Sequence, residues 1–109
     1  MKRIEVVVPE NDVLAIDEKL KGLGVGGVTV SKVKGRGKRA APQIHASKGT
    51  EIFTPEFSDK YVLDVIVPDS KEEEIIRIVR ANSRFGKIFI SPVTRAVDIA
   101  TGSEGEQAI

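Results

Sequence analysis

An internal repeat limits the folds open to this chain more than any other feature. Residues 4–30 and 63–89 follow one plan at a constant offset of 59, so that an apolar stretch ending at Pro9 is matched by one ending at Pro68. Each copy has the pattern of a strand, a proline turn, a helix, a glycine and a second strand. Two such βαβ units in one sheet predict an α+β fold, the ferredoxin-like double βαβ sandwich with the order βαββαβ.

Alternating and β-branched stretches predict the strands, and polar residues beside the apolar helical stripes predict the helix starts. Asn11 or Asp12 is expected to cap the first helix, and Ser70 with Glu73 is expected to form a capping box for the second. The predicted strands cover residues 2–8, 27–34, 61–67 and 87–90. Residues 93–99 are expected to add a short last strand, and the Gly-rich end at 101–109 is expected to be loose.

The first and third strands are apolar at almost every position, as in VVV and VLDVIV. Strands that are apolar on both sides are usually buried on both sides. Two helices cover one face of a sheet, so the second face is expected to meet another subunit in a closed homo-oligomer. The alternative is that Val6 and Val65 are simply exposed to solvent.

Length and composition predict one domain over 1–109 and exclude several kinds of site. The chain has no cysteine and one histidine, His45, which argues against disulfides and a structural zinc site. No apolar run approaches the ~20 residues of a membrane span. No nucleophile stands at a suggestive spacing from a base, so no catalytic residue, no metal site and no enzymatic activity are predicted.

The net charge of +1 hides a local basic stretch. Six Lys or Arg and no Asp or Glu lie between Lys32 and Lys48, and His45 is a possible further positive charge. The best candidate segment within it is 34–39, KGRGKR, because glycine N–H groups and basic side chains together suit phosphate. A flexible basic loop is an equal alternative. Nucleic acid is disfavoured, because no aromatic residue lies among the basic ones.

The chain resembles the PII nitrogen-regulatory signal proteins and their PII-like relatives. The stretches concerned are MKRIEVVVP, GVTVSKVKGRG, DVIVPD, GKIFISPV and DIATGSEGEQAI, in the expected order. The resemblance implies a cytoplasmic homotrimer with adenine nucleotides in the clefts between subunits. It also implies a T-loop over about 36–59 that docks onto a membrane transporter or metabolic enzyme, a B-loop remnant at 82–87 and a C-terminal tail at 99–109.

The same resemblance assigns the ligand-binding residues position by position. Thr29, Asp64 and Ile66 match positions around the adenine, and Lys60 matches a lysine at the base of the T-loop. Cations new to this chain are expected to serve phosphate beside the matched glycines. The full expected nucleotide-binding set is Thr29, Gly35, Arg36, Gly37, Lys38, Arg39, Lys60, Asp64, Ile66, Arg84, Gly86 and Lys87.

Several positions depart from the family pattern. The B-loop is about three to five residues shorter, two triphosphate-binding arginines of the family fall on Asp98 and Ala100, and its magnesium-site glutamine falls on Arg39. Each lost bidentate arginine removes roughly 1.5–3 kcal/mol of charge-assisted contact. Magnesium ATP with 2-oxoglutarate is therefore not expected. A small anion such as AMP, ADP, ATP or cyclic AMP is expected, with no required cofactor.

Two other functions stay open at this point. The chain is alternatively a trimeric interaction module that has lost nucleotide binding, which the changes at Asp98 and Ala100 favour. A weak nucleotide hydrolase is disfavoured, because no plausible base is present.

Overall fold

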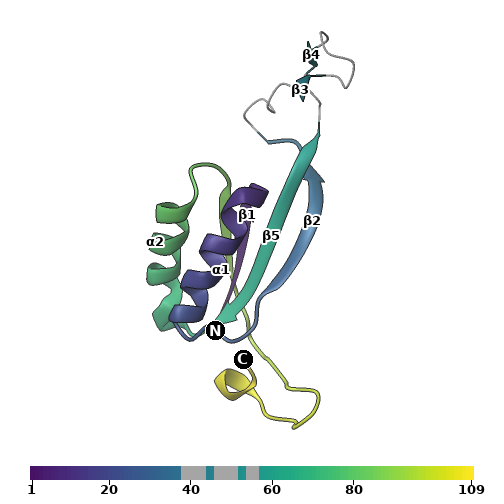
Figure 1. The fold of residues 1–109 in the computed structure, drawn as a ribbon. Helices are drawn as coiled ribbons and strands as arrows, with labels where there is room; N and C mark the ends of the chain where they lie inside the picture. Colours follow the sequence, from purple (N-terminus) through teal and green to yellow (C-terminus); the bar gives the residue numbers. More distant parts are fainter. Residues whose placement is uncertain (38–43, 46–51, 54–56) are drawn as a thin grey trace.

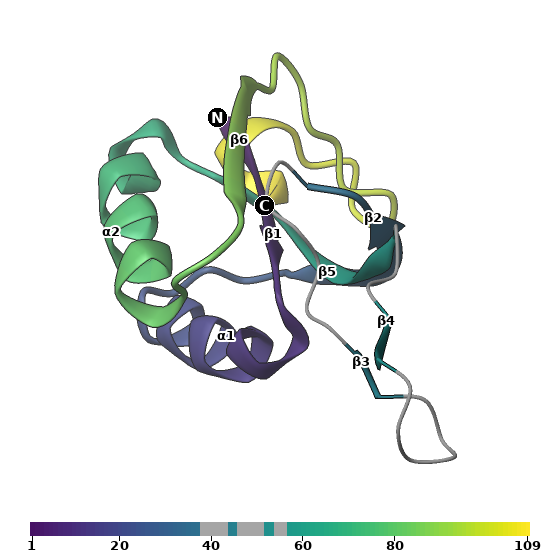
Figure 2. The ribbon, with the colours of Figure 1, turned by 90° about the horizontal axis from the view of Figure 1, so that it is seen from above.

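A computed structural model of the protein describes residues 1–37, 44–45, 52–53 and 57–109. A four-stranded antiparallel sheet has the order β2-β5-β1-β6, and two helices cover one of its faces (Figures 1 and 2). The expected α+β fold is confirmed. The sheet strands are β1 (Lys2–Val8), β2 (Thr29–Gly35), β5 (Ser58–Val67) and β6 (Lys87–Pro92), and the helices are α1 (Val13–Gly22) and α2 (Glu72–Asn82).

Each repeat is split by a strand of the other repeat. β5 lies between β1 and β2, and β1 lies between β5 and β6. The register pairs Val6 with Leu63 and with Ile88, so the two repeats share one sheet and one core. Neither half has a complete sheet of its own, which makes the pair the folding unit.

Both helices begin in the same way, and it is not the predicted one. The short 3₁₀ helices η1 (Glu10–Asp12) and η2 (Asp69–Lys71) precede α1 and α2 at the same offset of 59. The Pro9 and Pro68 carbonyls accept bonds from the third N–H beyond them, at 3.2 and 3.1 Å. Asp12 occupies the N-cap position of α1 as predicted, but no side-chain cap bond is made at either start, and the predicted capping box of Ser70 with Glu73 is wrong.

The core lies between the helices and the sheet. Alternation in β1 and β5 turns every second side chain toward the helices, and within 4–8 and 63–67 these side chains are all but fully buried. The core consists of Ile4, Val6, Val8, Ile16, Leu20, Val25, Leu63, Val65, Val67, Ile75 and Val79. The suggestion that Val6 and Val65 are exposed is therefore wrong.

The opposite side of the sheet, here called the open face, is not covered by the helices (Figure 1). It is formed by the alternate residues of the four strands, among them Val7, Val62 and Ile66, which are half-buried. Phe89, which pairs with Glu5, is 56% exposed, and Val33 on β2 is 38% exposed. The open face is thus partly apolar and available for contact.

The two segments outside the repeats are more ordered in places than expected. Within the predicted T-loop, β3 (Ile44–His45) pairs with β4 (Ile52–Phe53), and β5 begins at Ser58 rather than at 61. The tail forms η3 (Gly105–Ala108) at the end of the sheet near the N-terminus (Figure 1). The expected last strand over 93–99 is wrong, because only an isolated bridge joins Val97 to Glu104.

No helix in the described ranges is long and apolar enough to cross a bilayer.

Candidate ligand-binding site

The predicted nucleotide-binding residues fall into three groups in one chain. The first lies on the open face, the second at the base of the T-loop, and the third in the turn between α2 and β6. Lys38 and Arg39 lie outside the described residues. The groups are Thr29, Asp64 and Ile66; Gly35, Arg36, Gly37 and Lys60; and Arg84, Gly86 and Lys87.

The first group is brought together by strand pairing. Thr29 on β2 lies directly opposite Asp64 on β5, and Ile66 follows two residues further along the same face. Sequence reasoning missed the residue that engages Asp64. Arg3 on β1 donates from Nε to both carboxylate oxygens at 3.0 Å and from Nη2 to Oδ2 at 2.5 Å.

This ion pair has an electrostatic consequence for the first group. The hydrogen bond and the charge of Asp64 raise the pKa of Arg3, which therefore stays a cation. A ligand that reaches Asp64 meets a neutralised pair rather than a lone carboxylate. The signal available in the sequence was the alternation of β1, which turns Arg3 to the same face as Asp64.

The second group lies where β2 and β5 leave the sheet. A β-carbon at Gly35 would lie 3.4 Å from Cγ of Lys60, which is van der Waals contact. Lys60 therefore extends across Gly35 on the open-face side. Arg36 and Gly37 follow β2 and are exposed.

The positive charge of the basic stretch 32–48 is partly neutralised where β2 pairs with β5. Asp59 lies beyond that stretch but contacts Lys34 at 3.0 Å and Lys32 at 3.4 Å across the strands. Hydrogen bonds from Lys34 and Lys32 lower the pKa of Asp59. Two of the six basic residues are thus partly neutralised on the helix side of the sheet.

The third group lies in a turn that is fixed by close contacts. Gly86 has a φ of +133°, and a β-carbon there would lie 2.0 Å from the Val7 carbonyl oxygen. Ser83 Oγ lies 2.7 Å from Oδ2 of Asp12 and 2.9 Å from the carbonyl oxygen of Phe85. Only glycine fits at position 86, so the close approach of the turn to β1 is a sufficient reason for that residue.

Asp98 stands where an arginine of the family was expected, and it has a structural task. Its Oδ1 accepts bonds from the N–H groups of Ala100 and Thr101, each at 2.9 Å, and from the Thr101 hydroxyl at 3.1 Å. These bonds, those of Thr101 first, lower the pKa of Asp98. The carboxylate holds the turn after β6 and is not directed to a ligand by these contacts. The end at 101–109 is accordingly not loose, which corrects the expectation.

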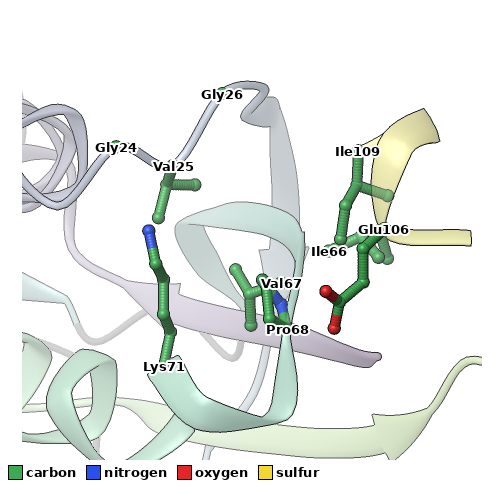
Figure 3. Close-up of a pocket in the computed structure, with 9 residues that line it drawn as sticks. All are labelled: Gly24, Val25, Gly26, Ile66, Val67, Pro68, Lys71, Glu106 and Ile109. Carbon is green, nitrogen blue, oxygen red and sulfur yellow. The ribbon is translucent and has the colours of Figure 1, made fainter.

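A small cavity lies beside Ile66, between the tail and the loop after α1 (Figure 3). Glu106 and Ile109 line it from the tail, and Lys71 lines it from the start of α2. Its volume is about 100 Å³, below the ~300 Å³ of ordinary ligand pockets. Lys71 is also engaged, since its Nζ donates to the Leu23 carbonyl at 2.5 Å. This cavity is too small for a nucleotide.

The three groups do not meet in one chain. Thr29 on β2 and Lys87 on β6 belong to the two edge strands, three strand spacings or about 14 Å apart. Neither the cavity beside Ile66 nor a second hollow beside the turn at 83–86 is lined by Thr29, Gly35 or Lys60. The described ranges also hold no group of three or more His, Cys, Asp or Glu that would suit a metal ion.

Comparison with known proteins gives the family. The model of the family described as nitrogen regulatory protein P-II matches residues 1–103. The chain belongs to this P-II family. Proteins named nitrogen regulatory protein P-II from Cereibacter sphaeroides and Haemophilus influenzae are each 32% identical to it over 114 aligned positions, and that from Nostoc punctiforme is 31% identical.

These alignments cover all of this chain and all of each relative. The resemblance read from the sequence is therefore confirmed at the level of the family. The P-II description names a regulator and not an enzyme, which agrees with the expectation that the chain is not one.

Proposed function

We propose that this P-II family member is a cytoplasmic sensor of a small anionic metabolite, an adenine nucleotide, that regulates a transporter or metabolic enzyme through its T-loop. The ligand would bind in clefts between the subunits of a homotrimer. AMP, ADP, ATP and cyclic AMP are the ligands to test. No cofactor is required.

The observation that supports this proposal most is the separation of the predicted residues within one chain. A ligand that contacts Thr29 on one edge strand and Lys87 on the other needs walls that one chain does not supply. A second copy of the chain placed against the open face would bring one of its three groups of predicted residues next to a different group of the first copy. The site would then be a property of the assembly.

The open face supports the same assembly by its chemistry. Its half-buried and exposed apolar side chains gain by leaving water, at about 25 cal/mol per Å² of apolar surface. Phe89 offers the largest single contribution, because its ring is aromatic and 56% exposed. The Arg3–Asp64 pair lies on the same face and would be satisfied when buried, since its two charges already meet.

Sedimentation together with calorimetry tests the two parts of the proposal separately. The expected results are a trimer and measurable heat with at least one of the four nucleotides. Phe89→Glu should give single chains and abolish nucleotide binding, because it places a charge in the proposed contact. Leu14→Glu is the matched control, because Leu14 lies on α1, away from the open face, and its side chain is 75% exposed. This substitution should change neither trimer formation nor nucleotide binding.

The alternative is a trimeric interaction module without nucleotide binding. The observation that favours it is Asp98, which replaces an expected phosphate-binding cation and is satisfied within its own turn. A trimer that gives no heat with any of the four nucleotides would decide for this alternative. A chain that sediments as a monomer would contradict both.

A further inference from the structure

A carboxylate outside the predicted nucleotide-binding set lies next to one of its members. Glu106, in η3 of the tail, lines the small cavity beside Ile66. Figure 3 shows its carboxylate directed toward Pro68, on the cavity side of Ile66. Ile66 is one of the residues predicted to lie around the adenine. The fold therefore brings a charged residue of the tail to the place where a base is expected.

Asp64 and Glu106 differ in what they can still accept. Asp64 is the carboxylate that was predicted near the adenine, but both of its oxygens accept bonds from Arg3 at 3.0 Å, and the two charges cancel. Glu106 is exposed and, in the part of the chain that the structure describes, makes no side-chain hydrogen bond or ion pair. A carboxylate has about four acceptor positions and donates nothing. Glu106 is therefore the acceptor that remains available to a ligand beside Ile66.

The cation that lines the same cavity does not neutralise Glu106. Nζ of Lys71 donates to the Leu23 carbonyl at 2.5 Å. Figure 3 shows this ammonium group beside Val25, on the other side of the cavity from Glu106. The cavity thus keeps an anionic wall, and a group that enters it along this wall meets acceptor oxygens.

The rest of the lining is largely apolar and leaves room for only part of a ligand. Val25 and Val67 belong to the core, and Ile109 contributes a side chain that is 38% exposed. The volume of about 100 Å³ equals that of roughly three water molecules. It admits one edge of a ring, whereas the ribose and phosphates of a nucleotide would remain outside.

Contacts within the tail hold the segment that carries Glu106. Nε of Arg95 donates to Glu104 at 2.6 Å, and Glu104 is also bridged to Val97. The N–H of Gly105 bonds the carbonyl of Ala96 at 3.0 Å. A carboxylate on an ordered segment loses less conformational freedom when it binds, which lowers the cost of the contact.

A carboxylate in this position distinguishes purines by the group at C6. Adenine has an amine there, which donates hydrogen bonds, whereas guanine has an oxygen, which only accepts. Hypoxanthine has the same oxygen. A 6-oxo group placed against a carboxylate would leave both acceptors unpaired and out of water, which is unfavourable. Sites built to hydrogen-bond one polar group reject analogues that cannot make the bond.

We infer that Glu106 is a specificity-determining residue that selects 6-aminopurine nucleotides over 6-oxopurine nucleotides. The edge of the base that carries the amine enters the cavity beside Ile66, and the amine donates to the Glu106 carboxylate. This inference rests on the proposed nucleotide function. It assigns the recognition of the base to the tail and leaves Asp64 paired with Arg3.

Calorimetry with ADP and inosine diphosphate tests the inference in the full chain, because the two bases differ in the group at C6. The unsubstituted protein should bind ADP at least about tenfold more tightly, the difference expected for one charge-assisted bond. Glu106→Gln should reduce this preference below about threefold, because an amide can both accept from an amine and donate to an oxygen. Glu74→Gln is the matched control. It removes the same charge from an exposed position on α2 that does not line the cavity, and it should keep the preference.

The ratio of the two affinities separates recognition from support of the tail. If Glu106→Gln weakened ADP and inosine diphosphate equally, Glu106 would have only a structural role, and the inference would be overturned while the proposed function stood. Equal affinity for the two nucleotides in the unsubstituted protein would have the same meaning. No heat with either nucleotide would overturn the inference together with the proposed nucleotide site.

Amide NMR shifts give a measurement that needs no variant. The amides of Ile66 and Glu106 should shift when ADP is added to the unsubstituted protein, and the amide of Glu74 should not. A Glu106 amide that does not respond to bound ADP would overturn the inference, whatever the behaviour of Glu106→Gln.

Discussion

The two repeats have the same fold, but the segment that follows the helix is held in place by different contacts in each repeat. The N-cap residue of α1, Asp12, and the N-cap residue of α2, Lys71, are equivalent at the offset of 59. Each reaches the end of the other helix. Lys71 donates to the Leu23 carbonyl beyond α1, and Asp12 accepts from the Ser83 hydroxyl beyond α2.

These two contacts, here called ties, differ in their chemistry, and the loops that they hold in place also differ. The loop after α1 is fixed by an ammonium group on a backbone carbonyl and lines only a small cavity. The turn after α2 is fixed by a neutral hydroxyl and by Gly86, and it presents Arg84 and Phe85 to a large hollow. The duplicated fold therefore has one connection held by its lysine and one that carries an exposed arginine, Arg84, beside a hollow.

The largest difference between the two connections is expected at their glycines. Gly86→Ala would place a β-carbon on the Val7 carbonyl and force a side chain into positive φ, for a loss of about 2–5 kcal/mol. Gly24→Ala should lose only about 1–2 kcal/mol, because Gly24 also has positive φ but has only Lys71 Nζ within 4 Å, at 3.5 Å. Urea unfolding at one fixed chain concentration measures both. Equal losses would show that the approach to β1 is unimportant.

The second-largest effect is expected at the tie made by Lys71. Lys71→Met keeps most of the side-chain volume but removes the bond to Leu23, for a loss of about 1.5–3 kcal/mol in the free energy of unfolding. Lys19→Met, an exposed position on α1, is the control and should change stability by no more than about 0.5 kcal/mol. If both variants unfold at the same urea concentration, the ammonium–carbonyl contact does not stabilise the first connection.

The sequence was sufficient for the sheet and helices because apolar periodicity is a local signal. It failed at the helix starts, where the Pro9 and Pro68 carbonyls take the role that Ser70 and Glu73 were expected to play. It failed again after β6. The Val93 N–H still bonds the carbonyl of Met1, but beyond it the described residues of 93–99 make only the isolated bridge between Val97 and Glu104.

The candidate sites could be predicted only in part, because their decisive contacts join residues far apart in the chain. Arg3 and Asp64 are 61 residues apart, and Ser83 and Asp12 are 71 apart. No periodicity or spacing rule predicts which polar pairs meet at such separations. The matched family positions gave candidate residues, whereas only the folded chain gives their partners.

A smaller effect is expected at the neutral tie of the second connection. Ser83→Ala removes the hydroxyl between Asp12 and the Phe85 carbonyl and should cost about 0.5–1.5 kcal/mol. A double-mutant cycle with Asp12→Ala should show coupling, because the two side chains are in contact. A cycle of Ser83→Ala with Asp17→Ala should show none, since Asp17 instead faces Lys21 within α1. Additive losses in the first cycle would show that the contact between Ser83 and Asp12 does not stabilise the turn after α2.

The smallest effect is expected where the chain leaves the second repeat. After β6, Asp98 holds the turn through bonds that lower its pKa. Because the folded pKa lies below the unfolded one, this stabilisation is complete above the ordinary carboxyl pKa and is lost as the pH falls through the lowered value.

Asp98→Ala should leave the urea midpoint unchanged, since the site is local and exposed. Hydrogen exchange at the Ala100 and Thr101 amides should become roughly tenfold faster at neutral pH, with no change at Val65 in the core. Acidification of the unsubstituted protein should reproduce that local opening. If exchange at Ala100 and Thr101 in Asp98→Ala matched that of the unsubstituted protein, the turn after β6 would owe its order to the backbone bonds between Asp98, Gly102 and Ser103 alone.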